Sequence, residues 1–143
     1  LRAERLHHAR VAQGDGRRAR HRAREGQLVV AHGDGPVAAQ EEHTEAAIVE
    51  VLARAGLAAR DLAVIEFAEA FAALCLRLER DLDLDPARLN PDGGTLALGH
   101  AFGATGAILA GNVAAHLAGL DGGHGVAAVS GAAGVGSAVL FAR

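Results

Sequence analysis

The sequence has little cysteine and no long hydrophobic run. Cys75 is the only cysteine among 143 residues, which excludes an intrachain disulfide and a cysteine-rich metal site. Apolar stretches are interrupted by Gly, His or Asp well before the roughly 18 residues that a transmembrane helix needs. The N-terminal residues lack the apolar segment of a signal peptide. We therefore expect a cytoplasmic protein without a membrane span and without a bound metal.

Aromatic residues are also scarce, and lysine, methionine, tryptophan and tyrosine are absent. Aromatic side chains make up 3% of the chain, whereas half of all residues are apolar and 19 are glycine. A chain of this length amounts to one domain and can bury a real core. The core is therefore expected to consist of Ala, Val, Leu and Ile, with glycine at turns and close contacts.

Residues 1–26 form a basic arm in a chain whose net charge is −3. Its arginines far outnumber its acidic residues, which are Glu4, Asp15 and Glu25. Such an arm is compatible with nucleic acid or an anionic membrane surface as a partner. No aromatic residue alternates with the arginines to stack on bases. We therefore expect no nucleic-acid partner and interpret the arm as a solvated, poorly ordered end.

Residues 27–143 predict one α/β domain. Short apolar runs bounded by turn residues are typical of strands, and two such runs joined by small residues are typical of a hairpin. The predicted strands lie at 27–32, 62–67, 95–98, 125–130 and 135–142, the third being a brief strand or an extended segment. Because helical segments alternate with these strands, a layered domain with a mixed sheet is the expected architecture.

Two helices are predicted from apolar residues at helical spacing, and a third from its alanine-rich composition. The first begins at Thr44 as N-cap and ends at Gly56 as a left-handed C-cap. The second extends through residues 68–84, and the third, which is rich in alanine, spans 103–119. One face of the second helix carries Phe71, Leu74, Cys75 and Leu78. Cys75 is therefore interpreted as a small core residue.

Three places hold side chains or turns capable of chemistry. His100, in a glycine-rich loop just before the third helix, can accept a proton from a nucleophile or donate to a developing oxyanion; a histidine is also common as a packing or surface residue. The turn SGAAGVG at 130–136 either presents N–H groups to an anion or is a plain hairpin turn. Glu66 and Glu69, at a strand-to-helix junction, are either acid/base groups or structural carboxylates that a helix N-terminus favours.

The order and spacing of these motifs are more specific than each motif alone. The stretch IEFAEAFAALCLRLERDLDLDPARLNPDGGTLALGHAFGATGA, closed by SGAAGVGSAVLFAR, resembles the C-terminal half of thiolases, the acetyl-CoA acetyltransferase and 3-ketoacyl-CoA thiolase family. That family typically reads N-E-A-F-A, then N-x-N-G-G-A-x-A-x-G-H-P-x-G-x-S-G, then C-x-G-G-G-x-G near its end. The likeness covers residues 44–143 and extends back to the strand at 27–32.

The resemblance implies a fold, a partner and a reaction. Thiolases consist of two similar βαβαβαββ halves in a five-layer sandwich, usually as dimers or tetramers. This chain would then be one half with a five-stranded mixed sheet. Its partner would be a thiolase N-terminal half or a homologous subunit, in a homo- or hetero-oligomer. In the family, a cysteine of the N-terminal half takes the acyl group as a thioester. A second cysteine in the C-terminal half moves the α-proton, and coenzyme A carries the substrates.

The resemblance also assigns roles to individual residues. His100 matches the histidine that activates the nucleophilic cysteine and helps to bind the thioester oxygen, a role that suits a group titrating near neutral pH. Ser130 replaces the acid/base cysteine, and a serine hydroxyl is a poorer base than a thiol of pKa about 8.5. Ala68 replaces an asparagine that holds an oxyanion-hole water, and losing one such donor typically costs a rate factor on the order of 10²–10³. The backbone N–H of Ala132 matches the second oxyanion hole. Ala101 replaces the usual proline.

No residue of this chain matches the acyl acceptor, because Cys75 falls in no family motif. We therefore expect this polypeptide alone to be inactive as a thiolase. The leading hypothesis is a C-terminal domain or subunit of a thiolase-type acyl-CoA acyltransferase. The alternative is a non-catalytic thiolase-like scaffold or lipid-carrier-type partner protein, which Ala68 and Ser130 favour because both replace side chains that the chemistry uses.

Overall fold

The structure is a computed structural model that describes residues 29–34, 40–131 and 135–143. The basic arm predicted over residues 1–26 lies outside the described residues, as does Ala132. The helices and strands follow one another as β1 (Val29–Asp34), α1 (Gln40–Ala55), β2 (Leu62–Ala68), α2 (Ala72–Leu82), α3 (Thr95–Leu98), α4 (Thr105–Ala118), β3 (His124–Gly131) and β4 (Val135–Ala142).

The described strands form one mixed sheet of four in the order β1-β4-β3-β2. The antiparallel pairing of β3 with β4 confirms the predicted terminal hairpin, and β1 adds antiparallel to β4. β2 lies at the opposite edge and runs parallel to β3. The carboxyl ends of β2 and β3 therefore meet at the same end of the sheet, where loops from both strands can build a site.

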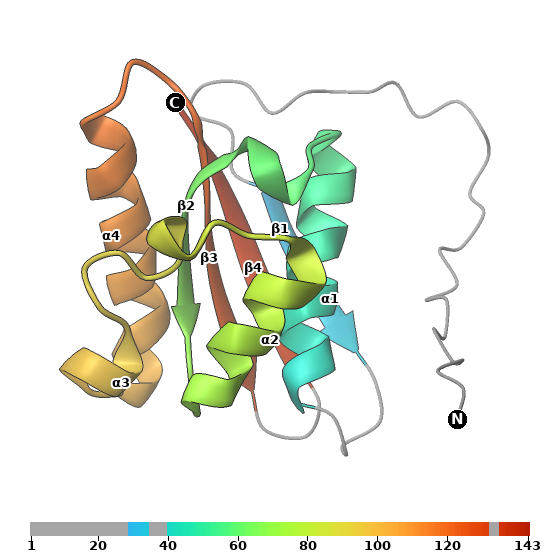
Figure 1. Cartoon of the computed structure of the whole chain (residues 1–143), viewed down its shortest axis with the longest axis vertical. Helices are drawn as coiled ribbons and strands as arrows, with labels where there is room; N and C mark the ends of the chain where they lie inside the picture. Colours follow the sequence, from blue (N-terminus) through green and yellow to red (C-terminus); the bar gives the residue numbers. More distant parts are fainter. Residues whose placement is uncertain (1–28, 35–39, 132–134) are drawn as a thin grey trace.

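Helices cover both faces of the sheet, which gives three layers, with α1 and α2 on one side and α4 on the other (Figure 1). The core on the first side includes Ile48, Val51, Leu52, Ile65, Phe67, Leu74, Leu78, Val126 and Leu140. The core under α4 consists of Val64, Ala68, Leu109, Val113, Leu117 and Ala127. Successive residues of β2 thus face opposite layers, as the two-residue period of a strand requires.

The predicted strand at 95–98 is wrong, because this segment is the short helix α3. The N–H of Leu98 donates to the carbonyl of Gly94 at 2.9 Å, and the N–H of Gly99 donates to that of Thr95 at 3.0 Å. These bonds close one helical turn. The prediction of a five-stranded sheet is corrected with it, since the described residues form four strands.

The outer edge of β2 shows why no strand pairs there among the described residues. The side-chain amide of Asn90 accepts a hydrogen bond from the N–H of Phe67 at 2.7 Å and donates one to its carbonyl at 3.0 Å. A fifth strand would need the same two backbone groups. Leu89 makes a single parallel bridge to Ile65, and the chain then turns away.

The predicted helices were correct in position but not at every end. Thr44 is not an N-cap, because α1 begins at Gln40 and the Thr44 side chain is buried within the helix. Gly56 does end α1 with a left-handed φ of 69°. Phe71 is also corrected, because it precedes α2 and is 68% exposed, whereas Leu74 and Leu78 are buried as predicted.

The third predicted helix is confirmed as α4. Its inward face carries Leu109, Val113 and Leu117, and its residues include no Asp, Glu, Lys or Arg. No helix among the described residues has both the length and the apolar character to cross a bilayer.

Candidate functional site

A cavity of about 320 Å³ lies at the carboxyl ends of β2 and β3. Figure 1 shows α3 and the first turns of α4 beside this end of β2. The residues that line the cavity are Ala68, Glu69, Ala70, Thr95, Leu96, His100 and Ser130. The structure thus brings three of the predicted site residues, His100, Ser130 and Ala68, to one cavity.

The two parallel strands place Ala68 and Ser130 side by side. Ala68, the last residue of β2, is in register with Val129 of β3, and Ser130 follows directly. Ala68 is buried and Ser130 is half-buried. The methyl group of Ala68 offers no hydrogen bond to a ligand, so the Ser130 hydroxyl is the polar side chain at this end of the strand pair.

His100 enters the cavity from the loop between α3 and α4. Gly99, with φ of 94°, adopts a conformation that glycine favours and turns the chain just before the histidine. Nδ1 of His100 lies 2.8 Å from the hydroxyl of Thr105, the buried first residue of α4. This contact leaves Nε2 for a ligand: as a base when Nδ1 carries the proton, and as a donor when Nε2 does. The ring of Phe102 packs beside the imidazole, with centroids 4.7 Å apart.

Glu69 and Glu66 were predicted as either acid/base groups or structural carboxylates. Only Glu69 lines the cavity, and its Oε2 accepts hydrogen bonds from the N–H of Thr95 at 2.9 Å and from the hydroxyl of Thr95 at 3.0 Å. Glu66 points under α4, is fully buried, and accepts a hydrogen bond from Asn112 at 3.1 Å. A substrate in the cavity therefore does not reach the Glu66 carboxyl.

Cys75 lies in α2, half-buried against the core, and does not line the cavity. Burial, followed by the nearby charges of Glu69 and Glu79, raises the pKa of its thiol. A thiol that resists ionisation is a poor nucleophile. The structure therefore supports the interpretation of Cys75 as a core residue.

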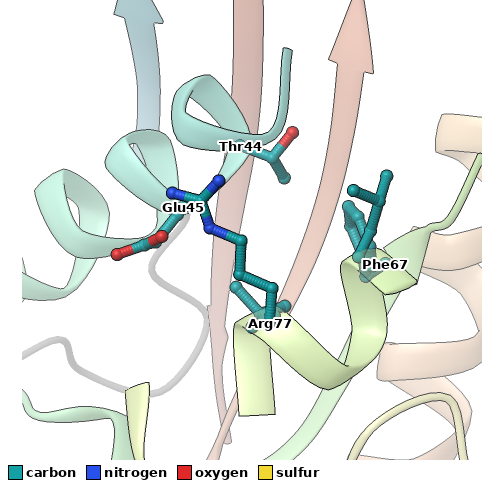
Figure 2. Close-up of a pocket in the computed structure, with 6 residues that line it drawn as sticks. Thr44, Glu45, Phe67 and Arg77 are labelled. Atoms are coloured by element: carbon teal, nitrogen blue, oxygen red, sulfur yellow. The ribbon is translucent and has the colours of Figure 1, made fainter. Parts of the chain in front are cut away.

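A second cavity, of about 10 Å³, lies between α1, α2 and β2 (Figure 2). In Figure 2 the side chain of Arg77 extends from α2 toward α1, where Glu45 lies. The Thr44 hydroxyl is buried at this place without a hydrogen-bond partner. This volume is about that of a single water molecule, so the cavity is too small for a substrate.

Sequence reasoning missed three residues that hold the site together. They are Thr105, which orients His100, Thr95, which binds Glu69, and Asn90, which binds β2. The glycine pair after Asn90 was a usable signal for the loop, because the N-x-x-G-G pattern is part of the family motif. No local pattern distinguishes Thr105 or Thr95 from surface threonines.

In the described part of the chain, no three His, Cys, Asp or Glu side chains gather where they could hold a metal ion.

Comparisons with known proteins agree with this fold. The thiolase C-terminal domain family matches residues 30–143. A probable acetyl-CoA acetyltransferase of Mycolicibacterium smegmatis is 40% identical over 115 residues, which cover 79% of this chain and 30% of that protein. A thiolase of Ascaris suum solved in complex with coenzyme A superimposes with a TM-score of 0.69 at 32% identity, over 78% of this chain and 28% of that one.

The peroxisomal 3-ketoacyl-CoA thiolase of Saccharomyces cerevisiae superimposes with a TM-score of 0.71 at 30% identity, over 80% of this chain and 32% of that one. It is described as a five-layered α-β-α-β-α structure built from two core domains of identical topology. The α/β domain with its His100 cavity is therefore a thiolase-like half. The chain belongs to the thiolase family, in which it matches the C-terminal domain. It spans about 30% of the length of the curated relative described above.

Proposed function

We propose that this chain is the C-terminal half of a thiolase-type acyl-CoA acyltransferase, and that His100 is its catalytic base. The observation that carries the proposal is the gathering of His100, Ser130 and Ala68 at one cavity at the carboxyl ends of two parallel strands. The acetyltransferase relative and the coenzyme A complex of the Ascaris thiolase support an acyl-CoA substrate.

His100 would act on a cysteine that an N-terminal half supplies, on the same or another polypeptide. Nε2 accepts the thiol proton while the sulfur attacks the thioester carbonyl of acyl-CoA. The tetrahedral intermediate then collapses, its bond to the sulfur of coenzyme A breaks, and the imidazolium returns the proton to that sulfur. The products are an acyl-cysteine and free coenzyme A. Thr105 at Nδ1 fixes the ring orientation that this transfer needs.

Ser130 and Ala68 limit which step the site performs well. Acyl exchange between coenzyme A and the partner cysteine needs only the base, which His100 supplies. Carbon–carbon bond formation also needs a group that removes the α-proton, and the Ser130 hydroxyl ionises far less readily than a thiol. We therefore propose that acyl exchange is fast relative to condensation.

We place the N-terminal half against the face of α4 that points away from the sheet. This face is apolar, and Ile108 on it is 50% exposed; exposed apolar surface of this kind marks a place where another protein binds. The yeast relative has five layers from two like domains, and two separate three-layer domains would give six. If the two domains share one helical layer, the total is five, and we propose that α4 belongs to this shared layer.

The replacements at Ala68 and Ser130 also favour a second candidate, a thiolase-like scaffold without catalysis. Both candidates predict binding to a thiolase N-terminal half, and they differ only in turnover. Isotope exchange between labelled coenzyme A and acetyl-CoA distinguishes them when the chain is mixed with the N-terminal half of the Mycolicibacterium acetyltransferase. Exchange in the mixture that is lost in His100→Ala supports the acyltransferase. A stable complex without exchange supports the scaffold.

A further inference from the structure

We propose that Glu69 is a positioning residue for His100, acting through the short helix α3. The Glu69 carboxylate binds the first residue of α3, and the end of α3 delivers the histidine to the cavity. This inference rests on the proposed function, in which His100 is the base. For Glu69 the sequence left an acid/base role and a structural role open, and the role proposed here does not require contact with the reacting atoms.

Several hydrogen bonds join Glu69 to the start of α3, and Glu69 is buried. Glu69 follows β2 directly and is 7% exposed. Its Oε2 accepts from the N–H of Thr95 at 2.9 Å and lies 3.0 Å from the Thr95 hydroxyl, which is also 2.6 Å from the backbone carbonyl of Glu69. Hydrogen bonds to an ionised acceptor are about twice as strong as neutral ones, so this contact fixes the start of α3 relative to the sheet.

Gly94 shows how closely the two segments approach. A β-carbon at Gly94 would collide with both carboxylate oxygens of Glu69 and would lie 2.5 Å from Nδ2 of Asn90. Only a residue without a side chain leaves room for the carboxylate there. Asn90 in turn binds the backbone of Phe67 in β2. The loop that carries α3 is therefore attached to the end of β2 at two points.

The chain path from α3 to His100 is so short that the Glu69 contact with α3 also restricts the position of the imidazole. α3 is a single turn from Thr95 to Leu98, Gly99 turns the chain, and His100 follows at once. The other hold on the ring is the contact of Nδ1 with Thr105 at the start of α4. Glu69, Thr95 and His100 all line the same cavity. Loss of the Glu69 contact would free the start of α3 and leave Asn90 at the loop and Thr105 at the ring as the remaining contacts.

The test uses the full chain with ¹⁵N-labelled histidine and measures the imidazole tautomer of His100 by long-range ¹H–¹⁵N NMR. We expect one dominant tautomer in the wild type. In Glu69→Ala the His100 nitrogen resonances should shift toward the average of the two tautomers. Glu69→Gln should restore the wild-type pattern, because its amide oxygen still accepts from the Thr95 N–H. Glu50→Ala, which removes an exposed carboxylate paired with Arg54 on α1, is the matched control and should change nothing at His100.

Unchanged His100 resonances in folded Glu69→Ala would overturn the proposal, as would a Glu69→Gln that behaves like Glu69→Ala. Should Glu69→Ala fail to fold, Thr95→Val removes only the hydroxyl contact and should shift His100 in the same direction by less; no shift would overturn the proposal equally. In the mixture with the N-terminal half, Glu69→Ala should lower kcat for exchange by about 10²-fold with KM unchanged. If the mixture shows no exchange while His100 responds to Glu69, the proposed function fails and the positioning role stands.

Discussion

Among the carboxyl groups of the described residues, Glu66 has the surroundings that least favour an ionised carboxylate. Its side chain is fully buried, Oε1 has no hydrogen-bond partner, and Oε2 accepts one bond from Asn112. Desolvation by burial raises the pKa of Glu66 above its ordinary value of 4.5, and the Asn112 hydrogen bond opposes this in part. The folded protein therefore keeps the Glu66 proton to a higher pH than the unfolded chain does.

This raised pKa makes stability depend on pH in a definite direction. Below pH 4.5 both states hold the proton, and the contribution of Glu66 to the unfolding free energy is fully present. As pH rises above 4.5, the Glu66 carboxyl ionises first in the unfolded chain, so its contribution to the unfolding free energy falls until the carboxyl of the folded protein ionises too. Each unit of difference between the two pKa values is worth about 1.4 kcal/mol. In Glu66→Gln this fall should disappear. Urea unfolding of both proteins between about pH 4 and 8 measures this dependence, and parallel pH profiles would contradict the prediction.

Ser130 tests the division between acyl exchange and condensation. In the mixture with an N-terminal half, Ser130→Cys should raise the rate of acetoacetyl-CoA formation, because a thiol of pKa about 8.5 ionises far more readily than a hydroxyl. The rate of coenzyme A exchange should stay within a factor of about 3, since a rate factor of 10 already needs about 1.4 kcal/mol of transition-state energy. Equal gains in both rates would show that Ser130 does not limit proton transfer.

At the scale of the elements, glycines decide how closely helices approach the sheet. A β-carbon at Gly136 of β4 would collide with the carbonyl of His43 and lie 2.8 Å from the backbone N of Thr44, both in α1. Backbone atoms of a packed helix cannot move aside cheaply, so α1 lies directly on this glycine. Gly111 of α4, in contrast, has nothing within 4 Å of a β-carbon.

These two glycines should respond oppositely to the same substitution. Gly136→Ala should destabilise the fold by about 1–3 kcal/mol, because added volume in a packed contact forces strain. Gly111→Ala should stabilise it by about 0.5–1 kcal/mol, since alanine loses less backbone entropy in a helix. Denaturant unfolding of both variants measures the difference. A Gly136→Ala protein as stable as the wild type would show that α1 does not pack as described.

The elements also show what a sequence pattern can and cannot predict. The strands at 62–67 and 135–142 were found as short apolar runs and the helix at 103–119 as an alanine-rich segment. Such apolar composition records burial, which the structure confirms. The segment 95–98 was assigned wrongly because its conformation depends on a contact with Glu69, which lies 26 residues earlier in the sequence. The candidate site was recognised through the motif, whereas the contacts of Thr95 and Thr105 depend on how three segments meet.

At the scale of the whole molecule, the exposed apolar side chains of the described residues indicate a surface that another protein covers. Large apolar side chains are exposed near the cavity and on α4, and they are Phe71, Leu96, Leu98, Phe102 and Ile108. Exposed apolar groups that gather in one region mark surfaces that bind another protein. We expect the chain alone to self-associate, and a clean monomer in size-exclusion chromatography at all concentrations would contradict this.

The position of the other half can be tested with two matched variants. Ile108→Ser alters the outward face of α4, and Leu76→Ser alters an exposed leucine of α2 on the opposite side of the sheet. Ile108→Ser should weaken binding of an N-terminal half by about tenfold or more, since burying such a side chain is worth about 1.5–3 kcal/mol, whereas Leu76→Ser should not. Titration calorimetry of both variants measures this, and the reverse order would place the partner on the other face.

The central claim is that His100 activates a cysteine nucleophile of a thiolase N-terminal half. Acetylation of that cysteine, followed by intact-mass spectrometry, tests this claim most directly. The N-terminal half of the Mycolicibacterium acetyltransferase is incubated with acetyl-CoA alone, with this chain, and with its His100→Ala variant. We expect the acetyl adduct on the N-terminal half to form rapidly only with the wild-type chain, and at least about 10²-fold more slowly with His100→Ala. Equal rates in all three samples, or an adduct on this chain itself, would contradict the assignment.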